Sequence, residues 1–297
     1  MVWGSTYLAI AIVVKEQPPL AAASLRFFSA GLVMAVLALI VDRKHPRPTA
    51  RQLADYALIG VLLLSVGNAF VMWSEKRIPS GIAALIVATV PLWLTLFDGL
   101  RRGGQSWTLR AWAGAAIGLL GVALVARPEG GVAAGHWLAI VALQVATLSW
   151  TAGSLYAQSL PKKLPLFTAS AVEMLAGSLV LLVESRVFGE DLGAFAAASS
   201  RSWLALAYLG VFGSLIGFTA FAYCLNELPA STVGTYAYVN PVVAVALGHL
   251  FLGEALSPGL LVGAAIILLS VLLTTARRSA PRARPVAAST LSEESAG

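Results

Sequence analysis

Charged residues are scarce in this sequence. Only 11% of its 297 residues are Asp, Glu, Lys or Arg, whereas 58% are hydrophobic and the mean hydropathy is +0.82. Because a water-soluble domain carries a charge on about one residue in four, a soluble fold is excluded. We expect an integral membrane protein, with the lipid bilayer as its first partner.

Cysteine and the common catalytic motifs are also missing or rare. The one cysteine, Cys224, allows neither an intrachain disulfide framework nor a cysteine metal cluster. The sequence has no H-E-x-x-H, G-x-S-x-G or P-loop motif, so we expect no enzyme, no cofactor and no metal site. The net charge of +6 comes from short Lys and Arg clusters between apolar runs, which does not indicate a nucleic acid partner.

Long apolar runs bounded by charges, Pro or Gly are abundant instead. Most are apolar around the whole helix circumference and lack strand alternation, which predicts about ten transmembrane helices. As a helix, the first run spans only about 21 Å of a hydrocarbon core of about 30 Å, so we expect residues to be missing before Met1. The ten runs lie at 1–14, 20–41, 53–74, 79–100, 107–126, 135–158, 167–187, 202–225, 230–252 and 258–275.

The distribution of Lys and Arg predicts the orientation in the membrane. With the N-terminus in the cytoplasm, thirteen of these residues fall on the cytoplasmic side and six on the other. We therefore expect a multi-pass protein of the inner (plasma) membrane with both termini cytoplasmic. Residues 276–297 have no apolar face, which predicts a disordered cytoplasmic tail.

The chain repeats itself after 147 to 150 residues. GAAIGLLGVAL at 114–124 and GAAIILLSVLL at 263–273 are identical at eight of eleven positions, and Pro91 matches Pro241. This predicts two five-helix repeats, at 1–126 and 135–275. Because five is odd, the second repeat enters the membrane from the opposite side. Inverted repeats around a central cavity are the usual construction of secondary transporters, which face each side of the membrane in turn.

Short motifs in both halves are similar to one known family. The first half has Trp3-Gly4-Ser5-Thr6-Tyr7, Pro18-Pro19, Arg26-Phe27, Pro79-x-Gly81 and Pro91, and the second has Tyr238-Val239-Asn240-Pro241, Gly248 and Leu252-Gly253-Glu254. The chain resembles the EamA-domain proteins of the drug/metabolite transporter superfamily. The resemblance implies ten helices, a central cavity and the export of metabolites or toxic compounds.

Two ionisable residues lie well inside predicted helices, where a charge costs roughly 2.5 to 3.5 kcal/mol. Arg26 and Glu173 are equivalent in the repeat. Opposite orientations place each about 9 Å below its own surface and leave about 12 Å between them, so we expect two separate polar sites. Arg26 could alternatively snorkel to the interface. Glu173 either faces the cavity, binding a cationic substrate or a coupling proton, or is a buried hydrogen-bonded acid.

Two prolines and two tryptophans match across the halves. Pro91 and Pro241 each remove a backbone hydrogen bond in mid-helix, which indicates either broken helices at a transport site or plain kinks. Trp3 matches Trp150, which lies in a polar, aromatic stretch that either faces the cavity or packs on a neighbouring helix. Glu254 follows a predicted helix, and we interpret it as a solvated charge at the helix end.

We therefore predict a secondary transporter that exports small metabolites, such as amino acids, or drugs by alternating access. A channel or lipid scramblase is the alternative, and it would need a continuous polar path. Protons are the candidate coupling ion. The Gly114-x-x-x-Gly118 motif favours packing within the chain, so we expect a monomer. The predicted cavity residues are Trp3, Tyr7, Arg26, Asn68, Pro91, Trp150, Tyr156, Glu173, Tyr236, Tyr238, Asn240 and Pro241.

Overall fold

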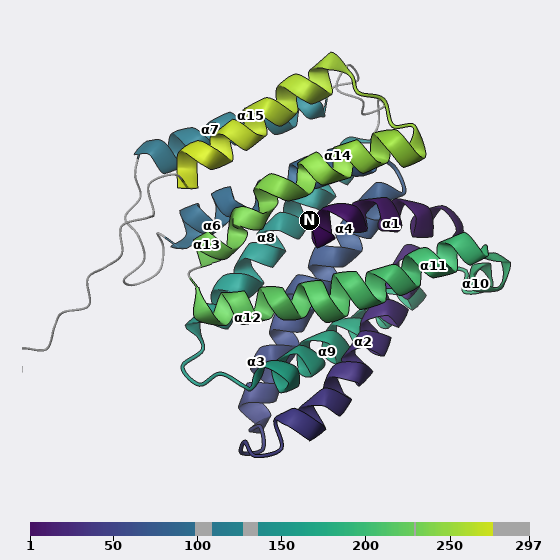
Figure 1. Cartoon of the computed structure of the whole chain (residues 1–297), viewed down its shortest axis with the longest axis vertical. Helices are drawn as coiled ribbons and strands as arrows, with labels where there is room; N and C mark the ends of the chain where they lie inside the picture. Colours follow the sequence, from purple (N-terminus) through teal and green to yellow (C-terminus); the bar gives the residue numbers. More distant parts are fainter. Residues whose placement is uncertain (99–108, 127–135, 229, 276–297) are drawn as a thin grey trace, which may run out of the picture.

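The computed structural model describes residues 1–98, 109–126, 136–228 and 230–275 (Figure 1). Throughout these ranges all regular structure is helical. The prediction of an all-α protein is therefore confirmed. The predicted tail at 276–297 lies outside the described residues.

In its described residues, the first half has five helical stretches, two of which are composite. They are α1 (Val2–Glu16), α2 (Pro19–Val41), α3 (Ala50–Gly60) continued by the π helix η1 (Val61–Gly67) and α4 (Asn68–Glu75), α5 (Ser80–Val87) followed by α6 (Val90–Asp98), and α7 (Leu109–Val125).

The second half repeats this order, with one extra short helix before its third stretch. Its elements are α8 (Trp137–Ser159), α9 (Leu166–Val187), the short α10 (Ala194–Ala197), α11 (Ser200–Tyr208) continued by the π helix η3 (Leu209–Phe218) and α12 (Thr219–Glu227), α13 (Ala230–Val233) continued by the 3-10 helix η4 (Gly234–Tyr238) and α14 (Val239–Leu252), and α15 (Pro258–Thr275).

Many of these helices are long and apolar enough to cross a membrane. Among the described residues, six qualify fully, and shorter apolar helices lie at Trp112–Val125, Tyr236–Leu252 and Pro258–Leu273. The protein is therefore a multi-span membrane protein. The six are Pro19–Val41, Ala50–Glu75, Ser80–Phe97, Trp137–Ser159, Leu166–Val187 and Ser200–Glu227.

Equivalent helices of the two halves share the same irregularities. The third stretch of each half begins at a hydroxyl N-cap, Thr49 or Ser199, which stand 150 positions apart in the sequence. Each of these stretches also changes from α to π geometry in its middle, at Val61–Gly67 and at Leu209–Phe218. Because π segments are rare, their occurrence at matching places shows that the repeat extends to backbone geometry.

Equivalent helices also pack against each other in opposite directions. In Figure 1, α7 and α15 lie side by side; Gly118 faces Ser270, whereas Val125 lies against Gly263. Residue numbers therefore rise along α7 in the direction in which they fall along α15, so the two helices run antiparallel. Equivalent helices that run antiparallel are related by a twofold axis across them, which is the inverted arrangement that the odd helix count predicts. The contact of Gly118 with Ser270 also uses the small-residue motif inside the chain.

The fourth stretch of each half is interrupted before its matched proline. Residues 88–89 separate α5 from α6, and the 3-10 turn η4 precedes α14. Pro91 and Pro241 lie in the first turn of the helix that follows, where a missing N–H costs nothing. The predicted broken helices are confirmed. They also meet, since Gly234 of η4 lies against the Pro91 ring.

Carboxylates of each half cap helices of the other half. The Asp42 side chain accepts hydrogen bonds from the Thr168 amide at 2.9 Å and hydroxyl at 2.8 Å, at the start of α9. Glu190 accepts the amides of Leu20 and Ala21, at the start of α2, at 3.0 and 2.9 Å. Helix N-termini carry unpaired N–H groups and a positive dipole end, so both caps stabilise the contact between the halves.

Replacing Asp42 with alanine should reduce the free energy of unfolding by about 1 to 2 kcal/mol, because the α9 N-terminus loses its anionic cap. Thermal unfolding of the purified protein in detergent measures the change. Glu227→Ala is the control, since that side chain is exposed at a helix end. Equal stability of the two variants would show that the Asp42 cap contributes nothing.

The Glu254 side chain caps a helix as well. One carboxyl oxygen accepts the Ser80 amide and hydroxyl, both at 2.7 Å, and the other accepts the Gly81 amide at 3.0 Å. The explanation of Glu254 as a solvated helix-end charge is therefore wrong. Its sequence position next to Gly253 placed it at a helix end, but only the fold shows that α5 begins beside it.

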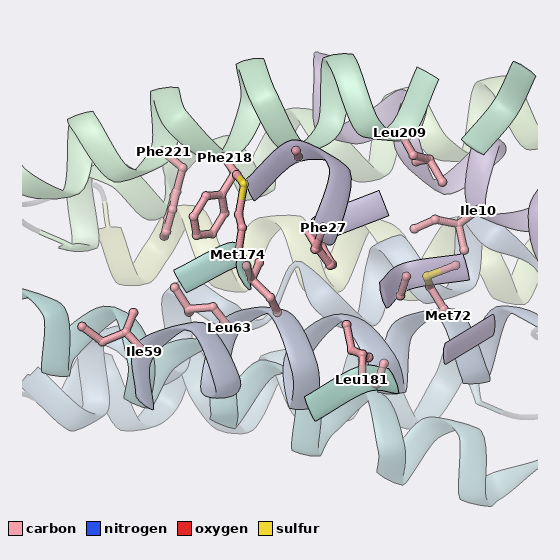
Figure 2. Close-up of a cluster of buried hydrophobic side chains, with 14 of the residues drawn as sticks. Ile10, Phe27, Ile59, Leu63, Met72, Met174, Leu181, Leu209, Phe218 and Phe221 are labelled. Atoms are coloured by element: carbon pink, nitrogen blue, oxygen red, sulfur yellow. The ribbon is translucent and has the colours of Figure 1, made fainter. Parts of the chain in front are cut away.

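The main hydrophobic core lies between the crossing helices (Figure 2). Phe27 of α2, Leu63 of η1, Met174 of α9 and Phe218 of η3 are all at most 2% exposed. Such close packing needs small residues at the crossings. The most extreme case is Gly60, where an added Cβ atom would lie 2.1 Å from the Glu173 carbonyl oxygen.

Candidate substrate cavity

A cavity of about 80 Å³ lies inside the bundle. Its lining comes from both halves: α1, α2, η1 and α4 and the α5–α6 break in the first, and α8, η3, η4 and α14 in the second. An ordered water needs roughly 10 to 15 Å³ of such space, so the cavity has room for several waters or a small solute. Seven predicted residues line it: Trp3, Tyr7, Arg26, Asn68, Trp150, Tyr236 and Asn240.

The helix breaks supply part of this lining. Val87 and Val90 flank the interruption before Pro91, and Tyr236 and Asn240 flank the one before Pro241. The least regular segments of these two helices therefore contribute residues to the same cavity. In transporters, irregular backbone at membrane depth is tolerated where it lines a cavity.

Arg26 brings the positive charge of the cavity. Its side chain is 5% exposed, its Nε donates to the Ser214 hydroxyl at 2.8 Å, and Nη1 reaches the Asn68 side-chain oxygen at 3.5 Å. The alternative that Arg26 snorkels to the interface is wrong, because these partners hold the guanidinium inside. No carboxylate of the described residues forms an ion pair with it. An anionic group entering the cavity would therefore find an uncompensated cation.

Aromatic rings form the other wall. Trp3 and Trp150, equivalent in the repeat, meet edge to face with ring centroids 5.6 Å apart. Trp3 also contacts Phe221 at 5.3 Å and Tyr236 at 5.0 Å, and Trp150 contacts Phe218 at 6.5 Å. Trp3 donates its indole N–H to the Gly213 carbonyl of η3 at 3.0 Å. Such edge-to-face clusters fit apolar or aromatic side chains.

The Trp150 indole N–H is less well paired by hydrogen bonds than the Trp3 indole N–H. It is buried and lies against Tyr236, yet forms no hydrogen bond of acceptable geometry with any described residue. Trp150 is a cavity-lining residue. A ligand oxygen is a suitable partner for such a donor.

The other five predicted residues do not line this cavity. Pro91 and Pro241 lie just behind its lining. Tyr156 donates to Asp55 at 2.7 Å, and the Tyr238 hydroxyl donates to the Val271 carbonyl at 3.0 Å. Glu173 is 4% exposed and packs its backbone on Gly60, away from the cavity.

Several cavity residues escaped the sequence analysis. Phe218, Thr6, Thr147 and Gly213 line the cavity, and Phe221 supports the Trp3 and Trp150 rings. Their helices are apolar around the whole circumference, so periodicity does not distinguish an inward face. The signal in the sequence that could have indicated them is the repeat. Gly67 matches Gly217, and each of these glycines lies in a π segment that lines the cavity.

The two halves pack differently at one equivalent crossing. Gly60 touches the Glu173 backbone, whereas Gly210, its equivalent 150 residues later, has open space where a Cβ atom would be. Three residues beyond Gly210, an added Cβ on Gly213 would lie 2.8 Å from the Arg26 guanidinium. In the second half, Arg26 therefore packs on Gly213 and not on Gly210.

An inverted repeat of membrane-spanning helices, with broken helices around a polar and aromatic cavity, defines a membrane transporter. The chain belongs to the EamA-like transporter family, which matches residues 1–127 and 137–276. The family thus matches the chain twice, once in each half.

Individual relatives agree with this assignment. The chain is 39% identical over 296 residues to the uncharacterized inner membrane transporter YedA of Escherichia coli (strain K12), covering 99% of this chain and 94% of YedA. It is 28% identical over 280 residues to a probable terminal-alkyne amino-acid exporter of Streptantibioticus cattleyicolor, covering 93% and 90%. A crystal structure with 22% identity has the same fold, with a TM-score of 0.66 and coverage of 93% of both chains.

Proposed function

We propose that the protein exports small organic molecules that carry a carboxylate and an apolar or aromatic part, amino acids being the leading class. The observation that carries this proposal is the pairing of one buried guanidinium, Arg26, with the aromatic wall around Trp3 and Trp150 in a single cavity. A planar guanidinium binds a carboxylate through paired hydrogen bonds. The uncompensated positive charge disfavours cationic drugs.

Alternating access is the mechanism that suits the inverted repeat. Both antiparallel copies of the fold line the cavity, and each copy can provide the gate on one side. The relative from Streptantibioticus cattleyicolor is named as an amino-acid exporter, which supports both the substrate class and the direction. The Lys and Arg distribution supports an inner-membrane protein with both termini cytoplasmic. We expect the monomer to be the transport unit.

Counterflow in proteoliposomes tests the proposal. Vesicles loaded with unlabelled phenylalanine should take up external radiolabelled phenylalanine faster than unloaded vesicles, and uptake should saturate. A cationic dye, which carries a positive charge and no carboxylate, is the contrasting probe and should not be transported. Uptake that rises linearly with concentration, without counterflow, would instead indicate a channel. Transport of the dye but not the amino acid would contradict the proposed substrate class.

A further inference from the structure

Glu75, the last residue of α4, is a buried carboxyl group that the cavity does not use. Its side chain is 7% exposed, and neither carboxyl oxygen has a hydrogen-bond partner among the described residues. Burying a carboxylate without donors costs several kcal/mol, whereas the neutral acid is tolerated more easily. A group of this kind binds a proton in the closed structure.

Glu75 lines neither of the two cavities but interacts electrostatically with one lining residue of each. It interacts with Tyr7, which lines the central cavity. It also interacts with Glu254, which lines a second cavity of about 50 Å³ together with Pro79, Ile82 and other residues. A proton on Glu75 therefore has a polar neighbour in the lining of each cavity.

The charges around Glu75 come from few elements. α4 packs against α1, α2, α5, α8 and η1. Of the ionisable residues these elements carry, Tyr7 on α1 interacts electrostatically with Glu75, whereas Lys15 and Glu16 on α1, Arg26 on α2, and His136 and Tyr156 at the two ends of α8 do not. Glu254, beyond the end of α14, adds a like charge. Lys76 and Arg77 follow Glu75 in the chain, but both are exposed, and Arg77 donates to the Trp73 carbonyl and lies over the Trp73 ring. Among the described residues no cation pairs with the Glu75 carboxyl group.

Glu254 connects Glu75 to the start of α5, and the contact between Glu254 and α5 is called the gate below. Its three accepted hydrogen bonds, from Ser80 and Gly81, hold the start of α5. At its other end α5 reaches Val87, which lines the central cavity. Releasing the Glu254 contact would free the helix that closes this end of the cavity.

We propose that Glu75 is the proton-binding site that couples transport to a proton gradient, acting on the contact between Glu254 and α5. With its proton bound, Glu75 leaves the contact intact and this end is closed. When the proton leaves toward the central cavity past Tyr7, two neighbouring carboxylates repel each other and the contact opens. In the proposed orientation this end faces outward, so each inward proton allows one export step. The coupling rests on the proposed transport function.

The gate can be tested without a substrate. Ile82 lines the Glu254 cavity and is 1% exposed, so Ile82→Cys, in a Cys224→Ala background, reports opening through its reaction with N-ethylmaleimide. Labelling rates are measured from mildly acidic to mildly alkaline pH. They are divided by the rates of the same cysteine with Glu75→Gln, which cancels the pH dependence of the thiol. The ratio should rise about tenfold with pH, as like-charge repulsion opens the contact.

Three variants make the outcome decisive. Glu227→Gln, an exposed control, should keep the full pH response. Glu173→Gln tests the rival buried carboxyl group: if it abolishes the response while Glu75→Gln does not, the proton site is Glu173 and the proposal is wrong. Glu254→Gln weakens the contact itself and should label fast at every pH. Slow labelling of Glu254→Gln at every pH would contradict the gate even if Glu75→Gln failed to fold.

Transport completes the test. Glu75→Gln mimics the protonated, closed state, so it should lose uptake driven by a pH gradient and most phenylalanine counterflow as well. Wild-type protein with counterflow but no response to a pH gradient would overturn the coupling and leave the proposed function standing. Absence of counterflow in the wild type would overturn the substrate proposal, whereas the labelling result would still decide the gate.

Discussion

Replacing Arg26 with methionine is expected to lower phenylalanine counterflow by roughly thirtyfold, since a hydrogen bond to a charged group contributes about 2 kcal/mol. The guanidinium is the cavity's means of holding a carboxylate, and Ser214 and Asn68 fix its orientation. Methionine has a similar length and suits the neighbouring Phe27 ring, so the fold should persist. Concentration-dependent counterflow and thermal unfolding are measured together.

The conservative change separates charge from geometry. Arg26→Lys keeps the charge but cannot form the forked contacts to Ser214 and Asn68, so it should raise KM more than it lowers the maximal rate. Arg47→Met is the control, because Arg47 is exposed outside the bundle. Counterflow by Arg26→Met at the wild-type rate would refute the role of the guanidinium in binding.

Replacing Gly60 with alanine should destabilise the protein by about 3 kcal/mol or more, because overpacking against a backbone cannot be relieved by a rotamer change. The new Cβ atom would lie 2.1 Å from the Glu173 carbonyl oxygen and 2.6 Å from its Cα atom. Either α3 or α9 must therefore move. Thermal unfolding in detergent and the yield of monodisperse protein measure the loss.

Gly210 provides the control at the equivalent place of the second half. Its added Cβ atom would meet open space, so Gly210→Ala should change the stability by no more than about 0.5 kcal/mol. If both variants lost the same stability, the cause would be backbone geometry common to these two helical stretches rather than the contact with Glu173.

Much of the fold followed from the sequence, because transmembrane helices are specified by composition and length. The repeat of GAAIGLLGVAL predicted the inversion, and the matched Pro91 and Pro241 predicted both helix breaks, since a missing backbone N–H acts locally. The π segments were not predicted. Their geometry depends on packing around Gly67 and Gly217, and no local signal in an apolar run specifies it.

The cavity was only partly predictable. Trp3, Arg26 and Asn68 stood out as polar or aromatic residues within apolar runs, and the structure brings them together. Glu75 was overlooked because it ends its helix beside Lys76 and Arg77, where a solvated charge is the ordinary expectation. Its burial depends on α1 and on the segment around Glu254, which lies 179 positions away in the sequence.

The exchange of caps between the halves bears on how the chain is made. While the first half emerges from the ribosome, the start of α2 still lacks Glu190 and the start of α5 still lacks Glu254. The start of α2 must remain hydrated until Glu190 has been inserted, and the start of α5 until Glu254 has been inserted, close to the end of the chain. The contacts between the two halves are therefore completed late in biogenesis. A ribosome-bound intermediate that stops before α14 should be far more sensitive to proteases than the complete protein.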